Sequence, residues 1–258
     1  SPSSTIHRLI YKLIDQHGKE MIWEKRPKSE FSVRNLLILD ECSMISEEMG
    51  RDLLSYGVPI LVLGDPAQLP PIDGAGFFTS SEPDFLLTKI HRQAEGSAII
   101  QIATRARMGQ RMIGGIYNDG EVIITGGKPA EKDLLKFDQI LVGTNKTRIH
   151  YNRVIRQALG RTSTYPVPGD KLICLKNNWN IDGMMNGSLW QLTSIRPNSF
   201  TKNRLNVELT NWDNPDQKVN AETHRCFFER DVPPPEGRDW RGLTQFTYGY
   251  AITVHKSQ

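Results

Sequence analysis

The chain has 258 residues and a formal net charge of +3, and 38% of its residues are hydrophobic and 24% charged. This composition excludes a largely disordered chain and is sufficient for a hydrophobic core. No apolar stretch approaches the about 20 residues of a membrane-spanning helix, and three scattered cysteines without a CxxC pair argue against a disulfide scaffold or a zinc knuckle. The cysteine usage favours a reducing, cytoplasmic compartment, and the small basic excess does not by itself indicate a nucleic-acid partner.

The first 34 residues carry a helical pattern followed by a turn. Within residues 5–15, apolar side chains recur with the spacing of one helix face, at Ile6, Leu9, Ile10, Leu13 and Ile14. This pattern predicts an amphipathic helix. The polar turn at residues 16–19 and the segment 21–23 then predict a small hairpin within residues 16–34.

Strand and helix signals alternate over residues 35–157. Residues 36–39 form a short apolar run, typical of a strand buried on both faces. A helix is expected over residues 46–55, with Ser46 as N-cap and with Met49, Leu53 and Leu54 on one face. The further expected elements are strands at 60–63 and 140–142 and helices at 90–108 and 146–159. Repeated strand–helix units predict an α/β fold with a mainly parallel sheet.

Residues 165–240 change character, because Gly, Asn and Pro separate short strand-like runs. These runs are Lys171–Leu175, Ser188–Ile195, Leu205–Leu209 and Arg225–Glu229. They predict a small all-β insertion that could close into a barrel. An apolar strand at residues 250–254 then returns the chain to the α/β part.

An acidic pair follows the first predicted strand, in the segment LLILDECSM at residues 36–44. Ligands of open α/β sheets bind at the carboxyl ends of strands. A carboxylate there can hold Mg²⁺ against nucleotide phosphates, and a second can orient or deprotonate an attacking water. We therefore assign Asp40 to magnesium and Glu41 to water. The alternative is that the pair merely starts a loop.

A second polar loop follows the next predicted strand, in LVLGDPAQLPPI at residues 61–72. Gly64 permits a tight turn, and Asp65 and Gln68 follow it. An uncharged amide near a γ-phosphate can sense that phosphate by hydrogen bonding. Two such loops at strand ends favour a binding site over polar loops that merely face solvent.

The motifs DECSM, GDPAQLPP, LTKIHRQ and YAITVHKSQ, in this order, resemble those of superfamily 1 helicases of the RecD-like branch. The resemblance runs nearly end to end. It implies a P-loop NTPase fold, in which the parallel sheets of two RecA-like motor domains carry an inserted barrel of the Src-homology-3 (SH3) type. It also implies ATP and Mg²⁺ as cofactors, movement from 5′ to 3′, and single-stranded DNA and single-strand/duplex junctions as partners.

The resemblance implies roles at the nucleotide. Asp40 would bind Mg²⁺, Glu41 would act as catalytic base, and Gln68, with Asp65 beside it, would couple phosphate sensing to the DNA groove. Arg92 in LTKIHRQ would reach the γ-phosphate, a task that suits a permanently charged, forked guanidinium. Read without its neighbours, Arg92 is a solvated cation on a helix.

The resemblance also implies contacts with the DNA backbone. The implied residues are Thr5 and His7 in STIHRLI, Thr144, Asn145 and Arg148 in VGTNKTRIHYN, and Thr253, His255, Lys256, Ser257 and Gln258 in YAITVHKSQ. Hydroxyls, amides and a lysine suit phosphate contacts that carry no sequence information. For His7, packing on the sheet is the alternative.

The resemblance divides the chain into four parts, which are a first motor domain at 1–90, the first part of a second motor domain at 91–164, the inserted barrel at 165–240, and a return to the second motor domain at 241–258. Residues 16–34 occupy the position of a strand-splitting pin hairpin, with a solvated basic loop as the alternative reading. The basic and aromatic residues of this segment are Lys19, Trp23, Lys25, Arg26 and Lys28. In the barrel, Trp179 and Trp190 could stack on bases, although the apolar alternation around Trp190 favours a core position.

The sequence departs from the family pattern in two places. No GxxxxGK[ST] phosphate loop occurs in the 258 residues, and the last arginine-bearing motif is absent. We therefore expect a fragment that hydrolyses ATP very poorly alone. Two other functions stay open. One is a non-catalytic nucleic-acid-binding module derived from the helicase fold, and the other is a P-loop ATPase with no nucleic-acid role.

Overall fold

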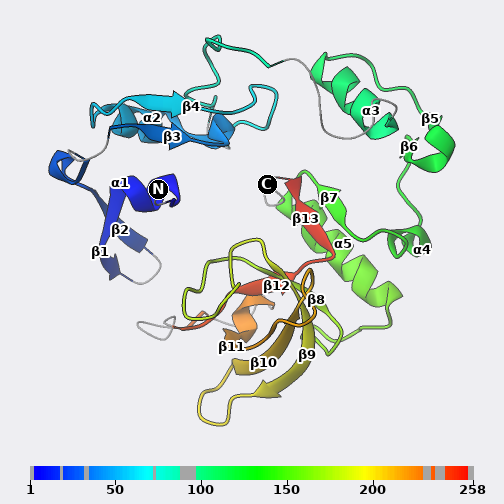
Figure 1. The fold of residues 1–258 in the computed structure, drawn as a ribbon. Helices are drawn as coiled ribbons and strands as arrows, with labels where there is room; N and C mark the ends of the chain where they lie inside the picture. The colour runs from blue at the N-terminus through cyan, green and yellow to red at the C-terminus, as the bar shows by residue number, and fades with distance from the viewer. Residues whose placement is uncertain are drawn as a thin grey trace. The chain divides into compact units, whose positions relative to one another are not determined.

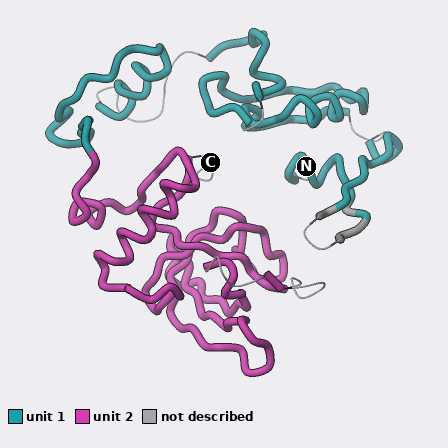
Figure 2. The backbone as a smooth tube through the Cα atoms, turned by 180° about the vertical axis from the view of Figure 1, so that it is seen from behind, with its two compact units in different colours: residues 1–127 teal, residues 128–258 magenta. Residues whose placement is uncertain are grey.

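The computed structural model describes residues 3–17, 20–31, 35–71, 74–87, 97–228, 234–235 and 242–254. Two compact units divide the chain, residues 1–127 and 128–258, and each is described by itself (Figure 2). The predicted boundaries at 90/91, 164/165 and 240/241 separate the expected helicase domains. A division into compact units does not test them, so they stay predictions.

The first unit begins with a short helix and a hairpin (Figure 1). Helix α1 spans Ile6–Ile10, and strands β1 (Tyr11–His17) and β2 (Glu20–Lys25) pair antiparallel from Tyr11↔Lys25 to His17↔Glu20. The predicted hairpin is therefore present but longer than expected. The predicted helix over 5–15 is wrong after Ile10, because Tyr11 is extended (φ −120°, ψ 152°) and the following residues pair with β2.

Polar contacts fix the base of the hairpin to α2 (Glu47–Leu54), the second helix of the first unit. Asp52 on α2 accepts hydrogen bonds from the Tyr11 hydroxyl (2.6 Å) and the Lys25 ammonium (2.8 Å). Just after α2, the hydroxyl of Tyr56 lies 3.1 and 2.9 Å from the carbonyl oxygens of Ile10 and Arg26. The two strands thus leave the unit from a defined position.

The Asp52 contacts make the hairpin anchor sensitive to acid. The Lys25 and Tyr11 hydrogen bonds lower the pKa of the Asp52 carboxyl. A carboxyl with a lowered folded-state pKa stabilises the fold above its unfolded pKa of about 4, and this contribution is lost as pH falls through the folded value. Because the pair is partly exposed, we expect less than about 1 kcal/mol.

Hydrogen exchange of residues 11–25 should accordingly quicken as pH is lowered below about 4, after correction for the intrinsic pH dependence of exchange. In Asp52→Asn this extra acceleration should be absent. An acid response that is unchanged in Asp52→Asn would contradict the assignment.

Two parallel strands and α2 form the core of the first unit. Strands β3 (Leu37–Leu39) and β4 (Ile60–Val62) pair in register, and the Ser46 hydroxyl caps α2 by accepting the Met49 N–H (3.4 Å). These elements confirm the strands predicted at 36–39 and 60–63 and the helix predicted at 46–55 with Ser46 as its N-cap. The buried core residues are Ile10, Phe31, Leu37, Leu39, Cys42, Ile45, Leu53 and Tyr56.

Two details of that prediction are wrong. Strand β3 is buried on one face only, because side chains alternate along a strand and Ile38, between buried Leu37 and Leu39, is 62% exposed. Leu54 is also exposed, so the apolar face of α2 is narrower than its composition indicates.

The remainder of the first unit holds one helix and a small hairpin. Helix α3 spans Ala98–Arg107, and strands β5 (Gly115–Tyr117) and β6 (Val122–Ile124) pair antiparallel. The predicted helix at 90–108 is confirmed over α3, while residues 88–96 lie outside the described part. Glu121 accepts from the Ser97 hydroxyl (2.5 Å) and the Ala98 N–H (3.1 Å), which caps α3.

The second unit starts with α/β elements. Helix α4 spans Glu131–Leu134, strand β7 spans Ile140–Val142 and helix α5 spans Asn145–Ala158. Strand β13 (Ala251–Thr253) pairs parallel with β7. The strands predicted at 140–142 and 250–254 and the helix at 146–159 are confirmed.

A five-stranded antiparallel sheet makes up the rest of the second unit, in the order β11-β10-β9-β8-β12 (Figure 1). Its strands are β8 (Lys171–Cys174), β9 (Leu189–Pro197), β10 (Arg204–Asn211), β11 (Lys218–His224) and β12 (Phe246–Tyr248). Its buried core residues are Leu172, Cys174, Met184, Trp190, Leu192, Leu205, Val207, Leu209, Ala221 and Phe246.

The antiparallel sheet differs from expectation at two strands. The last predicted strand, 225–229, is wrong, because Arg225–Phe227 form a helical turn and the strand runs over β11 instead. Strand β11 alternates buried Ala221 and Thr223 with more exposed positions, but it is too polar to stand out as apolar. Strand β12 joins this sheet although it lies in the predicted return at 241–258. None of the described helices has the length and apolar character needed to span a membrane.

Candidate functional site

Asp40 and Asp65 follow strands that run side by side. Because β3 and β4 are parallel, their carboxyl ends meet at one edge of the sheet. The Leu63 N–H donates to the Leu39 carbonyl (2.8 Å), and the Cys42 N–H donates to the Leu63 carbonyl (3.2 Å). The two loops after the strands are therefore held together by backbone hydrogen bonds.

The acidic pair lies in an unusual turn. Glu41 has left-handed backbone angles (φ 55°, ψ 50°), and the Asp40 carboxylate accepts the Glu41 N–H (3.0 Å). A left-handed conformation costs a residue with a Cβ about 1–2 kcal/mol, and such strain is often stored at functional sites. Both carboxylates are exposed, so they can meet a ligand from solvent.

Gly64 is required by the close approach of the two loops. A Cβ at this position would lie 2.4 Å from the Cys42 sulfur and 3.2 Å from the Cys42 backbone nitrogen. Glycine therefore permits the contact that fixes the turn after Glu41. Burial raises the pKa of the Cys42 thiol, which keeps it protonated as a packing group.

Gln68 contacts the loop of the acidic pair. The Ser43 hydroxyl donates to Gln68 Oε1 (3.2 Å), and the Gln68 N–H donates to the Asp65 carbonyl (3.1 Å). Ser43 lies in the turn Cys42–Met44, directly after Glu41. The Gln68 amide is thus linked to the turn that directly follows the two carboxylates.

Asp65 is engaged by a residue that sequence reasoning missed. Arg107, the last residue of α3, donates to both Asp65 carboxylate oxygens (2.8 and 2.9 Å), and the Ala67 N–H donates to the same carboxylate (2.9 Å). The Asp65 side chain therefore holds its own loop and α3. No local pattern marks Arg107, because its partner lies far away in sequence. Arg92 lies outside the described residues.

The acidic edge fits magnesium only as part of a nucleotide site. Within the described ranges, no three His, Cys, Asp or Glu side chains gather as a metal cluster. Mg²⁺ commonly binds through one or two carboxylates while it keeps waters and substrate phosphates as further ligands. Asp40, exposed at the end of β3, fits that donor set, whereas Asp65 is committed to Arg107.

A second sheet edge gathers predicted DNA-binding residues in the second unit. Thr144 caps α5 by accepting the Thr147 N–H (3.2 Å), and Arg148 donates to Asn145 Oδ1 (3.1 Å) and Thr247 Oγ1 (3.4 Å). Thr253 pairs with Val142 at the end of the parallel strands. These residues therefore share the carboxyl edge of β7 and β13. His255, Lys256, Ser257 and Gln258 lie outside the described residues.

The N-terminal candidates lie at the base of the hairpin. Thr5 caps α1 by accepting the Arg8 N–H (3.4 Å), and the His7 ring lies 4.8 Å from the Tyr11 ring and 4.3 Å from the Trp23 ring, measured between centroids. His7 thus packs on aromatic rings of the β1–β2 hairpin. Its contact with DNA stays a prediction.

The two tryptophans of the predicted barrel differ in burial. Trp190 is fully buried in the antiparallel core and its indole N–H donates to the Ser188 hydroxyl (2.8 Å), which confirms the core interpretation. Trp179 is 66% exposed.

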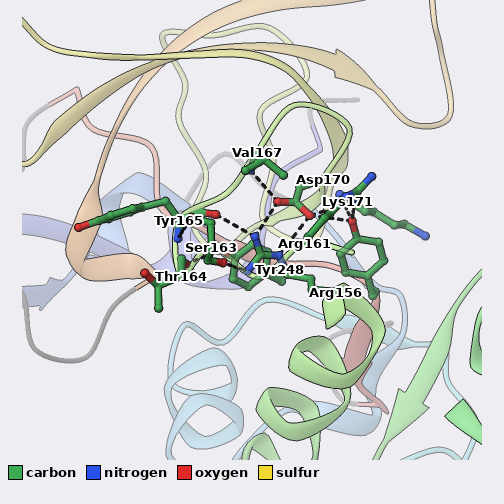
Figure 3. Close-up of polar contacts among 10 residues, drawn as sticks. Arg156, Arg161, Ser163, Thr164, Tyr165, Val167, Asp170, Lys171 and Tyr248 are labelled. Carbon is green, nitrogen blue, oxygen red and sulfur yellow. Dashed lines mark hydrogen bonds and ion pairs between the residues drawn. The ribbon is translucent and has the colours of Figure 1, made fainter. Parts of the chain in front are cut away.

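A buried ionic cluster at the junction of α5 and β8 gave no sequence signal (Figure 3). Asp170 is fully buried and accepts hydrogen bonds from Arg156 (3.2 and 3.3 Å), Arg161 (3.0 Å) and the Tyr250 hydroxyl (2.9 Å). We call Arg156, Arg161, Asp170 and Tyr250 the Asp170 cluster. It joins α5, the first strand of the antiparallel sheet and the residue before β13.

Tyr250 ties this cluster to the strand of the YAITVHKSQ motif. Its hydroxyl accepts the Lys171 N–H (3.1 Å), and burial is the largest of the effects that raise its pKa to about 12. Asn152 on α5 then exchanges two hydrogen bonds with the backbone of Ala251 (2.9 and 3.0 Å). The start of β13 is therefore positioned by side chains of α5.

Comparisons with known proteins agree with these observations. Residues 1–127 match a family model described as an AAA domain. An alignment of 285 positions gives 26% identity to the ATP-dependent RecD2 DNA helicase of Deinococcus radiodurans, covering 99% of this chain and 34% of that protein. An alignment of 77 positions gives 38% identity to uncharacterized protein R530 of Acanthamoeba polyphaga mimivirus, covering 26% of this chain and 16% of that protein.

The class of protein follows from the family model, which matches residues 1–127, and from the alignment that covers 99% of the chain. The AAA match and the parallel strand pairs indicate an α/β fold of the P-loop NTPase type. The similarity over nearly the whole chain confirms the resemblance to superfamily 1 helicases of the RecD-like branch. The chain spans about a third of the length of the helicase that it matches.

Proposed function

We propose that the chain is part of an ATP-dependent DNA helicase that couples ATP hydrolysis to 5′-to-3′ movement on single-stranded DNA and to duplex unwinding at junctions. The observation that carries the proposal is the Ser43–Gln68 hydrogen bond, which joins the turn directly after the acidic pair to the amide loop after β4. Motors of this kind need phosphate sensing and water activation at one place.

The nucleotide roles come from the resemblance, and the geometry of this edge supports those of Asp40, Glu41 and Gln68. Asp40 would hold magnesium, and the exposed Glu41 carboxylate would orient the attacking water and accept its proton. Gln68 would report the γ-phosphate to the loop that Asp65 and Arg107 hold, and Arg92 would add a positive charge at that phosphate. Magnesium, when bound with ATP, would neutralise phosphate charge.

The nucleic-acid roles come from the resemblance, and the second edge supports those of Thr144, Asn145, Arg148 and Thr253 by bringing these residues together. Thr144, Asn145 and Arg148 would contact the backbone of the strand together with Thr253 and the 255–258 segment, while Thr5 and His7 would do so in the first unit. The antiparallel sheet would correspond to the inserted SH3-like barrel, and the β1–β2 hairpin to the pin. The chain has three cysteines, none of them in a disulfide, which fits a cytoplasmic protein.

The alternative function is a non-catalytic nucleic-acid-binding module. It is favoured by one observation, the lack of a GxxxxGK[ST] motif in these 258 residues. Both functions require binding of single-stranded DNA, and only the first requires the acidic pair to act on water. A P-loop ATPase without a nucleic-acid role would bind no strand.

The experiment compares Glu41→Gln with Glu47→Gln in the natural protein that carries this chain. We expect Glu41→Gln to lower kcat for DNA-stimulated ATP hydrolysis by about 10²- to 10⁴-fold, because a general base is lost while nucleotide binding persists. Glu47 is an exposed acid on α2 that pairs with Arg51, so its variant should keep full activity.

Unchanged hydrolysis in Glu41→Gln would overturn the site assignment. The isolated 258-residue chain should bind single-stranded DNA but hydrolyse ATP very poorly. Robust Mg²⁺-dependent hydrolysis by this chain alone would contradict that expectation.

A further inference from the structure

A pocket of about 350 Å³ lies in the second unit, beside the edge that carries the predicted DNA-binding residues. Helix α5 forms its floor with Arg148, Asn152 and Arg153. One wall is residues 161–164, and the other is residues 226–228. Volumes of this size are typical of sites that enclose a small ligand or part of a larger one.

The pocket is strongly cationic. Four arginines line it, Arg148, Arg153, Arg156 and Arg161, and none of the lining residues is acidic. Two of them, Arg156 and Arg161, share one fully buried carboxylate, Asp170. Arg153 is exposed and has no carboxylate partner in the described part of the chain. The pocket therefore presents uncompensated positive charge.

Hydrogen bonds within the chain hold the wall at residues 161–164 in place. Arg156 donates to the carbonyl oxygens of Ser163 (2.6 Å) and Tyr165 (2.8 Å), and the Tyr248 hydroxyl donates to the Thr164 carbonyl (2.7 Å) (Figure 3). The Asp170 cluster thus holds three consecutive hydroxyl-bearing residues, 162–164, at the pocket rim. Preorganised donors of this kind lower the cost of binding.

The opposite wall is aromatic. Phe227 and Phe228 are half-buried and follow strand β11, and Phe228 packs 5.5 Å from the Tyr248 ring. Phe227 has its own ring contact with His224 at 6.3 Å. A cationic floor beside an aromatic wall is suited to a ligand that carries both a phosphate and a flat ring.

We propose that this pocket binds one nucleotide unit of a single-stranded nucleic acid, with the phosphate on Arg148 and Arg153 and the base against Phe227. The inference rests on the proposed function, because Arg148 also belongs to the predicted DNA-binding edge and makes the two surfaces continuous. An acidic peptide would satisfy the arginines but would leave the aromatic wall unused. The pocket adds Arg153 and Phe227 to the strand's binding path.

The test measures binding of a fluorescent oligothymidylate to the 258-residue chain between about 50 and 200 mM salt. We expect Arg153→Ala to weaken binding about five- to ten-fold and to reduce the salt slope by about 0.7, the value of one lost phosphate contact. Phe227→Leu should weaken binding about ten-fold with the slope unchanged, because stacking releases no counterion. Arg196→Ala removes an exposed arginine of β9 and should change neither quantity.

The outcomes separate the two proposals. Loss of all binding in the unaltered chain would overturn the proposed function together with this pocket. Normal binding by the unaltered chain and by Arg153→Ala and Phe227→Leu would overturn the pocket alone. Competition by polyglutamate as strong as by oligothymidylate would assign the pocket to an acidic peptide instead. Circular dichroism of each variant shows whether the fold is kept.

Discussion

Asp170→Asn is expected to lower the free energy of unfolding of the second unit by about 3–5 kcal/mol, the usual result of removing one partner of a buried ion pair. The substitution leaves Arg156 and Arg161 without a negative charge, although Arg156 is itself buried. Because the chain has two compact units, unfolding in urea is best followed by hydrogen exchange of residues 128–258.

A matched control is Asp133→Asn, which removes a carboxylate from a surface pair with Lys136 and should leave the unfolding midpoint unchanged. Tyr250→Phe should cost about 1 kcal/mol, since it removes one hydroxyl from the same cluster while the charges stay paired. An Asp170→Asn variant as stable as Asp133→Asn would show that the Asp170 cluster does not hold α5, β8 and the start of β13 together.

Trp190→Ala is the second large effect that we expect, with a loss of about 3–5 kcal/mol from the cavity that it leaves. The side chain is fully buried between residues of the antiparallel core. Urea unfolding followed by hydrogen exchange of residues 171–224 measures the change. Trp190→Phe keeps most of the volume and should cost clearly less.

The control is Trp179→Ala, because the exposed Trp179 should change stability by no more than about 0.5 kcal/mol. The two variants together distinguish packing from base stacking. If Trp190→Ala kept its stability and lost only DNA binding, the core interpretation would be wrong.

The local parts of the fold could be predicted from sequence. Short apolar runs gave β3, β4, β7 and β13, and Ser46 marked the start of α2, because these signals depend on neighbouring residues. The acidic pair and Gln68 were found for the same reason, since each directly follows such a run.

Features that depend on distant partners were missed. The Asp65–Arg107 pair and the Asp170 cluster join residues from separate elements, and single charged residues carry no periodic pattern. The helix predicted beyond Ile10 failed because pairing with β2 outweighed local helical spacing. Strand β11 was missed because polar residues, such as the fully buried Thr223, fill positions that an apolar pattern would mark.

The parallel pair of β7 and β13 has a consequence for the order of folding. It joins residues more than about a hundred positions apart, and such a distant contact is slow to form because loop closure is entropically costly. The pairing of β8 with β12, and the Gly249 N–H bond to the Lys171 carbonyl (2.8 Å), bring the two ends of the intervening sheet together. Formation of the antiparallel sheet therefore shortens the effective loop, so we expect β13 to reach its partner only after this sheet has formed.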